Sequence, residues 1–379
     1  MTTLRQLPPP PGSLSVFPGP ASSAGRTNDD LEGPAPTGRP SSAEVGTALA
    51  AAVRAGWIGD LPLPGSGDSA ARFAAFARTC AADVTLGRLV EAHADAVAIL
   101  AELDDGGATA SWAGQEACWG VWAAEHPAAT LSAAPTSSAG PEAGPGRVAP
   151  DASWRVSGAK AWCSGAPFLT HALVTAAAAD GNRLLAVSLA EPGVRVADDA
   201  WAFSGMRASG TSTVTFDEVA ARPVGPPGAY LERPGFWHGA VGVAACWFGG
   251  AVGVARALSG AAGRRELDPH ALAHLGAVDA ELGAAASLLR EAAAQIDADP
   301  GDEAGQAQRR ALRVRAVVER AADEVLRRVG RALGPGPLVG DLEHARRVED
   351  LTIYLRQSHA ERDLATLGGL VAAGEPGWC

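Results

Sequence analysis

Residues 154–166 decide the fold, and they read W-R-V-S-G-A-K-A-W-C-S-G-A. The first half alternates apolar and polar residues as a β-strand does, and S-G-A-K at 157–160 is typical of a turn. The segment therefore predicts a β-hairpin whose second arm carries Trp162, Cys163 and Ser164 in extended conformation and ends at Gly165. An indole beside a hydroxyl and free backbone N–H groups suits a planar, hydrogen-bonding ring system, although an ordinary hairpin with a core tryptophan has the same pattern.

Composition and charge exclude several classes of partner. The chain has 379 residues, enough for two or three domains, and a formal net charge of −11. That charge argues against nucleic acid or an anionic membrane as the main partner. No apolar run reaches membrane-spanning length without charges or frequent glycines, and the N-terminus lacks the pattern of a signal peptide. We therefore expect no nucleic-acid partner and no membrane.

The five cysteines are scattered and never stand in a C-x-x-C spacing. An odd, scattered set is typical of reduced thiols in a cytoplasmic protein, not of a disulfide framework or a zinc site. The sequence also lacks an H-E-x-x-H motif and the glycine patterns of Walker and Rossmann nucleotide sites. We expect a cytoplasmic protein without a metal ion.

Four segments differ in texture. Residues 1–41 are rich in Pro, Gly and Ser, which is typical of a disordered tail, and residues 42–112 show helical periodicity. Residues 113–228 alternate like strands between turns, and residues 229–379 return to long helical patterns joined by short loops. The predicted fold class is α+β, with an N-terminal helical domain, a central antiparallel β-barrel or sandwich, and a C-terminal four-helix bundle.

The expected elements follow from those patterns. Helices are predicted over 42–53, from Asp68, and over 83–103, and strands over 119–124, 173–175, 184–189, 193–196 and 212–216, with an exposed loop at 133–150. The bundle helices are predicted over 239–258, 268–296, 303–333 and 341–367.

The sequence resembles the acyl-CoA dehydrogenase family over essentially all of the chain after residue 42. The family's G-x-K turn followed by W-[ILC]-[TS]-[NG] has its counterpart in Gly158, Lys160, Trp162, Cys163 and Ser164. Further matches follow in the family's order: E-P-G-V at 191–194, G-M-R-A-S at 205–209, V-T-F-D-E-V at 214–219, and E-R-P with G-A-V-G between 232 and 242. The resemblance implies FAD bound between the β domain and the bundle, with Trp162, Cys163 and Ser164 against the flavin ring. It also implies an acyl thioester substrate.

The family's usual catalytic base is missing. Most members supply a glutamate from the last helix in I-Y-E-G, whereas this chain reads I-Y-L-R, which puts Leu355 at that position. An alignment anchored on Asp350 puts Ser358 there instead, and neither residue can remove an α-proton. A minority of members use L-E-R at the start of the first bundle helix, which makes Glu232 the candidate base. The alternative is a solvated glutamate favoured by the helix dipole.

His359 is a second candidate catalytic residue. Flavin monooxygenases of the same fold place a histidine in the last helix near the flavin, where it can hold or accept a proton. The alternative is a polar helix face on which His359 pairs with Asp363 four residues later.

The family's other cofactor contacts are altered. The T-E-P-x-x-G-S segment corresponds to A-E-H-P-A-A-T at 124–130, so Glu125 replaces the threonine and Thr130 is the candidate for the serine. The R-x-x-F-G segment that supports the neighbouring subunit's FAD is replaced at 263–269, where Arg264 or Arg265 is the candidate for a phosphate contact. The glycine-rich loop is reduced to G-P-G-P at 334–337, and its two prolines remove two backbone donors.

Three functions remain open. The leading hypothesis is an FAD-dependent oxidoreductase that acts on the CH–CH group of an acyl thioester. The alternatives are a flavin-dependent monooxygenase of the same fold and a non-catalytic homologue that acts as a binding or scaffold protein. The resemblance also implies a homodimer or homotetramer assembled through the bundle.

Overall fold

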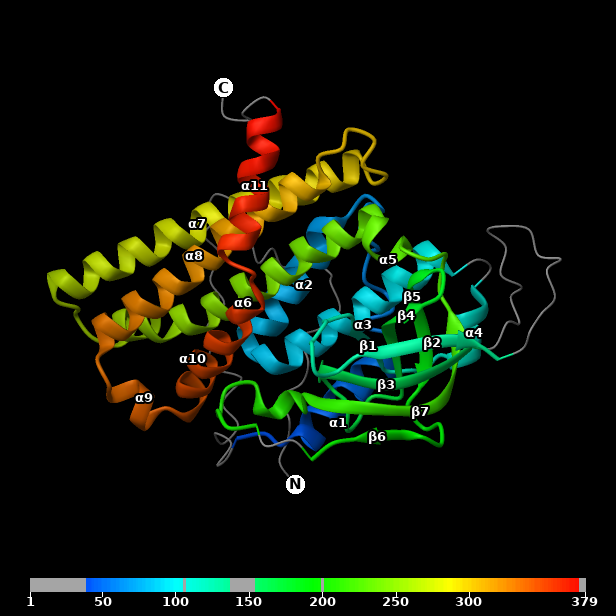
Figure 1. Cartoon of the computed structure of the whole chain (residues 1–379). Helices are drawn as coiled ribbons and strands as arrows, with labels where there is room; N and C mark the ends of the chain where they lie inside the picture. Colours follow the sequence, from blue (N-terminus) through cyan, green and yellow to red (C-terminus); the bar gives the residue numbers. More distant parts are fainter. Residues whose placement is uncertain (1–38, 105–106, 137–153, 199–200, 375–379) are drawn as a thin grey trace.

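The computed structural model describes residues 39–104, 107–136, 154–198 and 201–374. Long helices pack side by side in one half of the molecule and a strand barrel forms the other half (Figure 1). The mixed fold, with a closed barrel and C-terminal helices, is the one predicted. The tail predicted at 1–41 lies almost wholly outside the described residues, as does most of the loop predicted at 133–150. The boundaries between domains stay a prediction.

The N-terminal helices begin within one residue of the predicted positions, and Asp68 caps its helix as predicted. They are α1 (Ser42–Arg54), α2 (Ser69–Ala82) and α3 (Val84–Leu103). Ser41 and Glu44 form a reciprocal capping box on α1, while Asp68 and Asp83 accept hydrogen bonds from the first-turn amides of α2 and α3. A short helix, α4 (Ala108–Ala113), follows and was not predicted.

The described residues form seven strands in one sheet, and five of these strands close into a barrel. The seven strands are β1 (Trp119–Trp122), β2 (Leu131–Pro135), β3 (Trp154–Cys163), β4 (His171–Ala178), β5 (Gly181–Ser188), β6 (Val194–Val196) and β7 (Ser212–Pro223). The ring runs β4–β2–β3–β7–β5 and returns to β4, while β1 and β6 extend it at β4 and β7. The antiparallel prediction is wrong for two pairs, because β1 and β2 both run parallel to β4. The segments between these strands are long enough for the crossovers that parallel pairing requires.

The predicted hairpin at the start of the decisive segment is also wrong. β3 runs without a turn from Trp154 to Cys163, and its register against β7 shifts between Val156 and Gly158 and again between Lys160 and Cys163. Gly158 has φ of +124°, and a Cβ there would collide with the carbonyl oxygen of Thr130 on the facing strand. Glycine therefore lets β2 approach closely while β3 shifts its register by a residue against β7.

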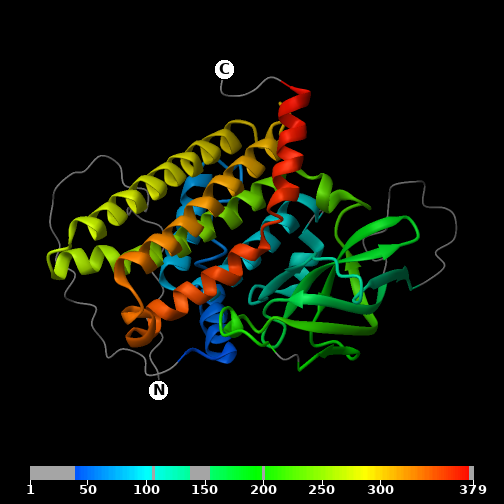
Figure 2. The same cartoon turned by 60° about the vertical axis from the view of Figure 1, so that its left-hand side comes forward.

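The C-terminal helices form the bundle. They are α5 (Ala229–Glu232), α6 (Pro234–Arg264), α7 (Pro269–Ala298), α8 (Ala307–Leu333), α9 (Gly336–Gly340), α10 (Leu342–Tyr354) and α11 (Glu361–Ala373), with the 3-10 turn η4 (Leu355–Gln357) between the last two. The single last helix predicted over 341–367 is wrong. The chain breaks at 358–360, where Ala360 has φ of +46°, and α11 then projects away from the bundle (Figure 2).

Candidate functional site

Trp162, near the end of β3, presents its indole to solvent. Its φ is +61°, so the extended backbone predicted for this residue is wrong. A left-handed backbone is unfavourable for a bulky residue and clusters at functional sites. The side chain is 58 % exposed, and His126 and Trp201 stand edge-on to it at ring distances of 6.4 and 6.5 Å. The result is an open flat face bordered by two aromatic rings. Neither neighbour was among the predicted site residues.

Three hydroxyl groups lie in a row beside the exposed indole of Trp162. The Oγ of Ser164 is 3.0 Å from Oγ1 of Thr211, which is 2.7 Å from Oγ of the fully buried Ser209. The amide of Gly165 donates to the carbonyl of Ser209, which holds the two segments together. Each hydroxyl can donate or accept, so the row can adapt to either kind of ligand atom. The matches at 205–209 pointed to this loop but assigned it no role.

Cys163 does not share the exposed face. Its side chain is fully buried, and Sγ lies 3.3 Å from the carbonyl oxygen of Lys160. Successive side chains of a strand point to opposite faces of the sheet, so Cys163 faces the core while its neighbour Trp162 faces solvent. The cysteine thus contributes packing to the β barrel.

Glu125 and Thr130 lie beside different residues of β3, Glu125 near Lys160 and Thr130 next to Ala159. The Lys160 ammonium is buried and donates to the carbonyl oxygen of Ala124 at 3.1 Å and to Oγ1 of Thr175 at 2.8 Å. Burial lowers the pKa of Lys160, and the nearby exposed Glu125 opposes that shift. Thr130 instead accepts from the amide of Ala159 beside Gly158. Glu125 is therefore the nearer of the two to Trp162.

Glu232 ends α5 with an exposed side chain, next to a firmly held arginine. Arg233 is 5 % exposed and donates to Glu102 at 2.8 Å, with Asp95 at 3.7 Å. Both carboxylates belong to α3. After β3, Gly165 lies close to Leu89 of the same helix. Leu89 is six residues before Asp95, which places it about 9 Å from Asp95 along the helix axis. Glu232 and Trp162 therefore lie beside different positions along α3. Among the described residues, no contact joins the two side chains.

A buried ion pair between Arg88 and Glu91 lies on α3 close to Leu89. Nη1 of Arg88 donates to Oε2 of Glu91 at 2.9 Å, and Glu91 is only 4 % exposed. Burial raises the pKa of Glu91 to about 7, the Arg88 charge opposes the shift and Asp95 adds to it. A carboxyl that titrates near neutral pH is a candidate proton carrier. In the sequence the pair reads as an ordinary i,i+3 salt bridge, because nothing local shows that it is buried.

The position of the family's usual glutamate is apolar and buried. Leu355 is 0 % exposed and Tyr354 is 1 % exposed. Tyr354 packs edge-on against Trp247, with 6.3 Å between the ring centres, and the Arg315 guanidinium lies 4.6 Å from the centre of the Trp247 ring. The Tyr354 hydroxyl and the Trp247 Nε1 have no hydrogen-bond partner among the described residues. The alignment anchored on Asp350 puts Ser358 at this position, and the Ser358 hydroxyl donates to Glu319 at 2.5 Å.

Asp350, one of the alignment anchors, links the bundle to the barrel. It accepts from the amide of Met206 at 2.6 Å and from Oγ1 of Thr85 at 3.2 Å. Burial raises the pKa of Asp350 to about 6, against the hydrogen bond from Met206 and the charge of Arg346. This carboxyl joins α10, α3 and the loop before β7.

His359 stands in the break before α11 and not within a helix. Its side chain is 58 % exposed, and Nδ1 is 3.2 Å from Oδ1 of Asp363. The predicted pairing with Asp363 is confirmed. No described contact joins His359 to Trp162.

The candidate phosphate ligands lie far from β3 within one chain. Arg264 ends α6 and Arg265 follows it, both exposed. The α6–α7 connection and α9 sit at the end of the bundle away from the barrel (Figure 1). Among the residues that the structure describes, no group of three His, Cys, Asp or Glu side chains could hold a metal ion.

Comparison with known proteins identifies the fold. Residues 133–219 match the family model of the acyl-CoA dehydrogenase middle domain. No curated protein matches the sequence. KijD3, solved with FMN and dTDP-3-amino-2,3,6-trideoxy-4-keto-3-methyl-D-glucose, superposes with a TM-score of 0.71 at 22% identity, covering 87% of each chain.

Two further solved structures are similar. A nitrososynthase from Micromonospora carbonacea var. africana has a TM-score of 0.70 at 21% identity, covering 87% of this chain and 92% of that chain. The dibenzothiophene monooxygenase TdsC from Paenibacillus sp. A11-2, solved with FMN and indole, has a TM-score of 0.66 at 20% identity, covering 88% and 98%. The resemblance is therefore confirmed: the chain has the acyl-CoA dehydrogenase-like fold, and residues 133–219 match the middle-domain model of that family.

Proposed function

We propose that the protein is a flavin-dependent oxygenase that uses reduced flavin and dioxygen to oxidise a small molecule. The observation that carries this proposal is Leu355. Dehydrogenation needs a carboxylate at the α-carbon, and the position of the family's usual glutamate holds a fully buried leucine in the turn η4, directly after Tyr354. The similarity to KijD3, the nitrososynthase and TdsC favours the same choice.

The residues at the end of β3 fit a flavin ring. Trp162 presents an open indole face, which stacks well on a flat aromatic system. Ser164 and Thr211 present hydroxyls that can bond ring nitrogens and oxygens. A reduced flavin held there would supply the electrons that activate dioxygen.

The form of the flavin follows from the other end of the bundle. In the family, the segment that corresponds to 263–269 supports the FAD of the neighbouring subunit, and the glycine-rich loop that corresponds to 334–337 cradles the cofactor. Here the first has exposed arginines without the family's phenylalanine, and the second leads into α9 with two prolines. The FAD expected from the resemblance therefore loses part of its support, and FMN, which lacks the adenosine half, is the form we favour. KijD3 and TdsC were solved with FMN.

The chain's own residues supply positioning and proton transfer. The hydroxyls of Ser164, Thr211 and Ser209 form a row along which a proton can shift between oxygens. Glu91 can hold a proton near pH 7, while the buried Tyr354 and Leu355 exclude water from the neighbouring core. His359, paired with Asp363, is the exposed candidate for proton exchange with solvent.

A dehydrogenase with Glu232 as its base is the second candidate. The observation that favours it is Arg233, whose contacts to Glu102 and Asp95 hold the L-E-R segment against α3. The substrate would then be an acyl thioester, as the resemblance implies. A non-catalytic role follows only if the protein binds no flavin.

One experiment separates these functions. The protein is loaded with FMN or FAD and mixed anaerobically with a panel of acyl thioesters, and flavin bleaching is recorded. In parallel, reduced flavin and air are supplied with indole, a thiophene and a dTDP-linked amino sugar, and products are searched for an added oxygen atom. We expect oxygenated product and no bleaching.

Two variants sharpen the result. If Glu232 is a base, Glu232→Gln slows bleaching by about 10²–10⁴-fold and leaves flavin bound. His359→Ala should impair only the oxygen-dependent reaction. Thioester bleaching that depends on Glu232 would overturn the oxygenase proposal, and a protein that takes up neither flavin would support the scaffold role.

A further inference from the structure

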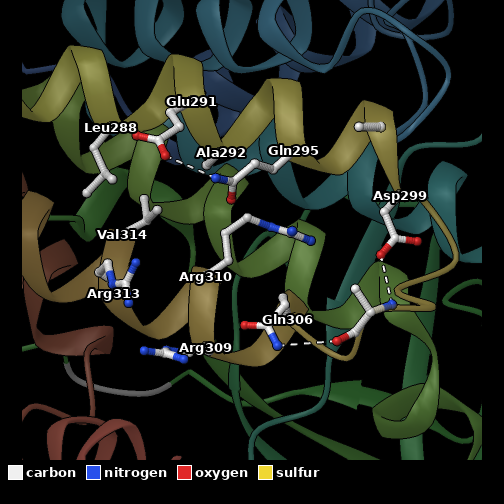
Figure 3. A pocket seen from close by; sticks show the side chains of 12 residues that line it. Leu288, Glu291, Ala292, Gln295, Asp299, Gln306, Arg309, Arg310, Arg313 and Val314 are labelled. Carbon is white, nitrogen blue, oxygen red and sulfur yellow. Dashed lines mark hydrogen bonds between the residues drawn. The ribbon is translucent and has the colours of Figure 1, made fainter. Parts of the chain in front are cut away.

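A cavity of about 340 Å³ lies between α7 and α8, beside the loop that joins them. Figure 3 shows arginines from the first turns of α8 on one wall and Glu291 and Gln295 of α7 on the other. None of the residues that border this cavity belongs to the site at the end of β3. Its volume is at the small end of the range for small-molecule sites.

The cavity contains a buried cation with unused donors. Arg310 is only 9 % exposed, and its Nε and Nη2 are buried without a hydrogen-bond acceptor among the described residues. Its guanidinium projects from α8 into the space beside Asp299 (Figure 3). Burial lowers the pKa of Arg310, and the charges of Asp302 and Asp299 oppose that shift. A buried charged donor without an acceptor is unfavourable, so this position favours an added anion.

The nearby carboxylates do not meet that need, because the loop uses them. Asp299 accepts from the amides of Glu303 and Ala304 at 2.9 and 3.1 Å. Asp302 accepts from the amides of Gln306 and Ala307, both at 2.7 Å. They hold the turn before α8 and make no hydrogen bond to Arg310.

The charged side chains on the walls, three arginines against two carboxylates, leave a net positive charge. Arg309 and Arg313 border the cavity with Arg310, against the carboxylates of Glu291 and Asp299. Glu291 accepts from the Gln295 amide at 3.0 Å. All three arginines lie within the first two turns of α8, where the helix dipole adds positive potential.

We propose that this cavity binds a phosphate-bearing small molecule, with Arg310 as its principal ligand. A guanidinium presents parallel N–H groups that match two oxygens of one phosphate. The cavity is larger than a single phosphate requires, so it leaves room for a diphosphate or for the group attached to it. The proposal does not depend on the flavin reaction.

The test uses inorganic pyrophosphate and phosphate as probes. Isothermal titration of the full chain at low ionic strength should show binding, weakened by added salt. Arg310→Gln should weaken it by at least tenfold, since a hydrogen bond to a charged group is worth about that factor. Arg310→Lys keeps the charge and the alkyl stem, yet it should also lose affinity because it lacks the fork.

Arg320→Gln is the matched control. This arginine is exposed on the same helix and does not border the cavity, so its loss should leave affinity unchanged. Pyrophosphate should also raise the melting temperature of the wild type and of Arg320→Gln, but not of Arg310→Gln. This readout reports any folding defect of the variants directly.

Three results would overturn the proposal. They are no binding by the wild type at millimolar pyrophosphate, unchanged affinity in Arg310→Gln, and an equal loss in Arg320→Gln, which would mean unspecific charge attraction. Flavin content, measured on the same samples, should be equal in all variants. A failure of the flavin proposal is therefore distinguishable from a failure of this one.

Discussion

At the scale of single residues, Trp162 is the position where backbone geometry and exposure coincide. A tryptophan with φ of +61° and 58 % exposure gains little from packing, so the fold holds it there against local preference. The bulge between Lys160 and Cys163 produces this geometry by shifting β3 against β7. Stacking of a planar ligand on the exposed indole would account for the arrangement.

The flavin contact can be tested at this site. Ser164→Ala should weaken flavin binding by about 1 kcal/mol, the net value of a typical hydrogen bond. Trp162→Ala should weaken it more, because a stacking surface is lost. Fluorescence titration of flavin measures both. Trp112→Ala is the control, since Trp112 is a partly exposed tryptophan that contacts His171 and Arg222 instead. Unchanged affinity in both site variants would remove the end of β3 from the cofactor site.

Asp350 makes a prediction about pH. Its pKa in the folded protein, about 6, is above its ordinary value of 3.8, so the folded state holds a proton that the unfolded chain has lost between those values. Stability from this group is therefore fully present below about pH 4 and decreases as pH rises to about 6, by on the order of 1–3 kcal/mol.

Asp350→Asn resembles the protonated form and should lack this decrease. Urea unfolding at pH 4 to 8 measures the difference in stability between wild type and variant. That difference should shift in favour of the variant as pH rises through the window and stay level above it. A difference that is independent of pH would contradict the assignment.

At the scale of elements, close packing of α6 on α2 positions the core of the bundle. A Cβ on Gly249 would overlap backbone atoms of Ala77, and one on Gly253 would come within 2.8 Å of the carbonyl oxygen of Ala81. Glycine is unfavourable within a helix, so its presence here reflects the contact with α2. The small residues of α6 thus permit the two backbones to approach each other.

Gly249→Ala should destabilise the protein although alanine favours helix. Alanine gains about 1 kcal/mol in helix propensity, but the overlap with Ala77 is expected to cost about 1–3 kcal/mol. Gly276→Ala in α7 is the matched control, because a Cβ there meets nothing within 4 Å, and it should be neutral or stabilising. Thermal unfolding compares the two. A stabilised Gly249→Ala would show that the helices can separate without penalty.

At the scale of the whole molecule, α7 and α11 leave apolar surface uncovered. By length and composition alone both α6 and α7 could cross a membrane, but 78% of the apolar window of α6 is buried inside the protein, against 22% for α7. Leu272 of α7 is 52 % exposed and Leu364 of α11 is 51 % exposed. α11 has no buried residue, and it stands out from the bundle in both views (Figure 2).

Such surfaces are typical of subunit interfaces, and we propose a homodimer or homotetramer that covers them. Sedimentation at micromolar concentration should show more than one copy. Leu272→Glu places a charge on the α7 surface and should shift the equilibrium toward monomer. A wild-type monomer over the whole concentration range would contradict this assembly.

Local signals in the sequence determined the order of elements and most of their beginnings. Asp68 caps its helix as predicted, and the helices capped by Ser41 and Asp83 begin close to the predicted positions, because a cap bonds amides only two or three residues away. The family's motifs indicated the correct fold, and the sequence itself showed leucine at position 355 in place of the family's usual glutamate. Each of these features depends on residues that are close in the chain.

Only the tertiary structure decided how distant segments meet. Gly158 lies within β3 and not in a turn, and the carbonyl oxygen of Thr130 occupies the space that a Cβ on it would need. Glu91 and Asp350 titrate near neutral pH because helices and a barrel loop remove them from water, which no neighbouring residue reveals. Nε and Nη2 of Arg310 have no acceptor among the described residues, and amides of the α7–α8 loop bond the nearby carboxylates of Asp299 and Asp302. Register, burial and competition for hydrogen bonds depend on partners far apart in sequence, so they are settled only when the chain is packed.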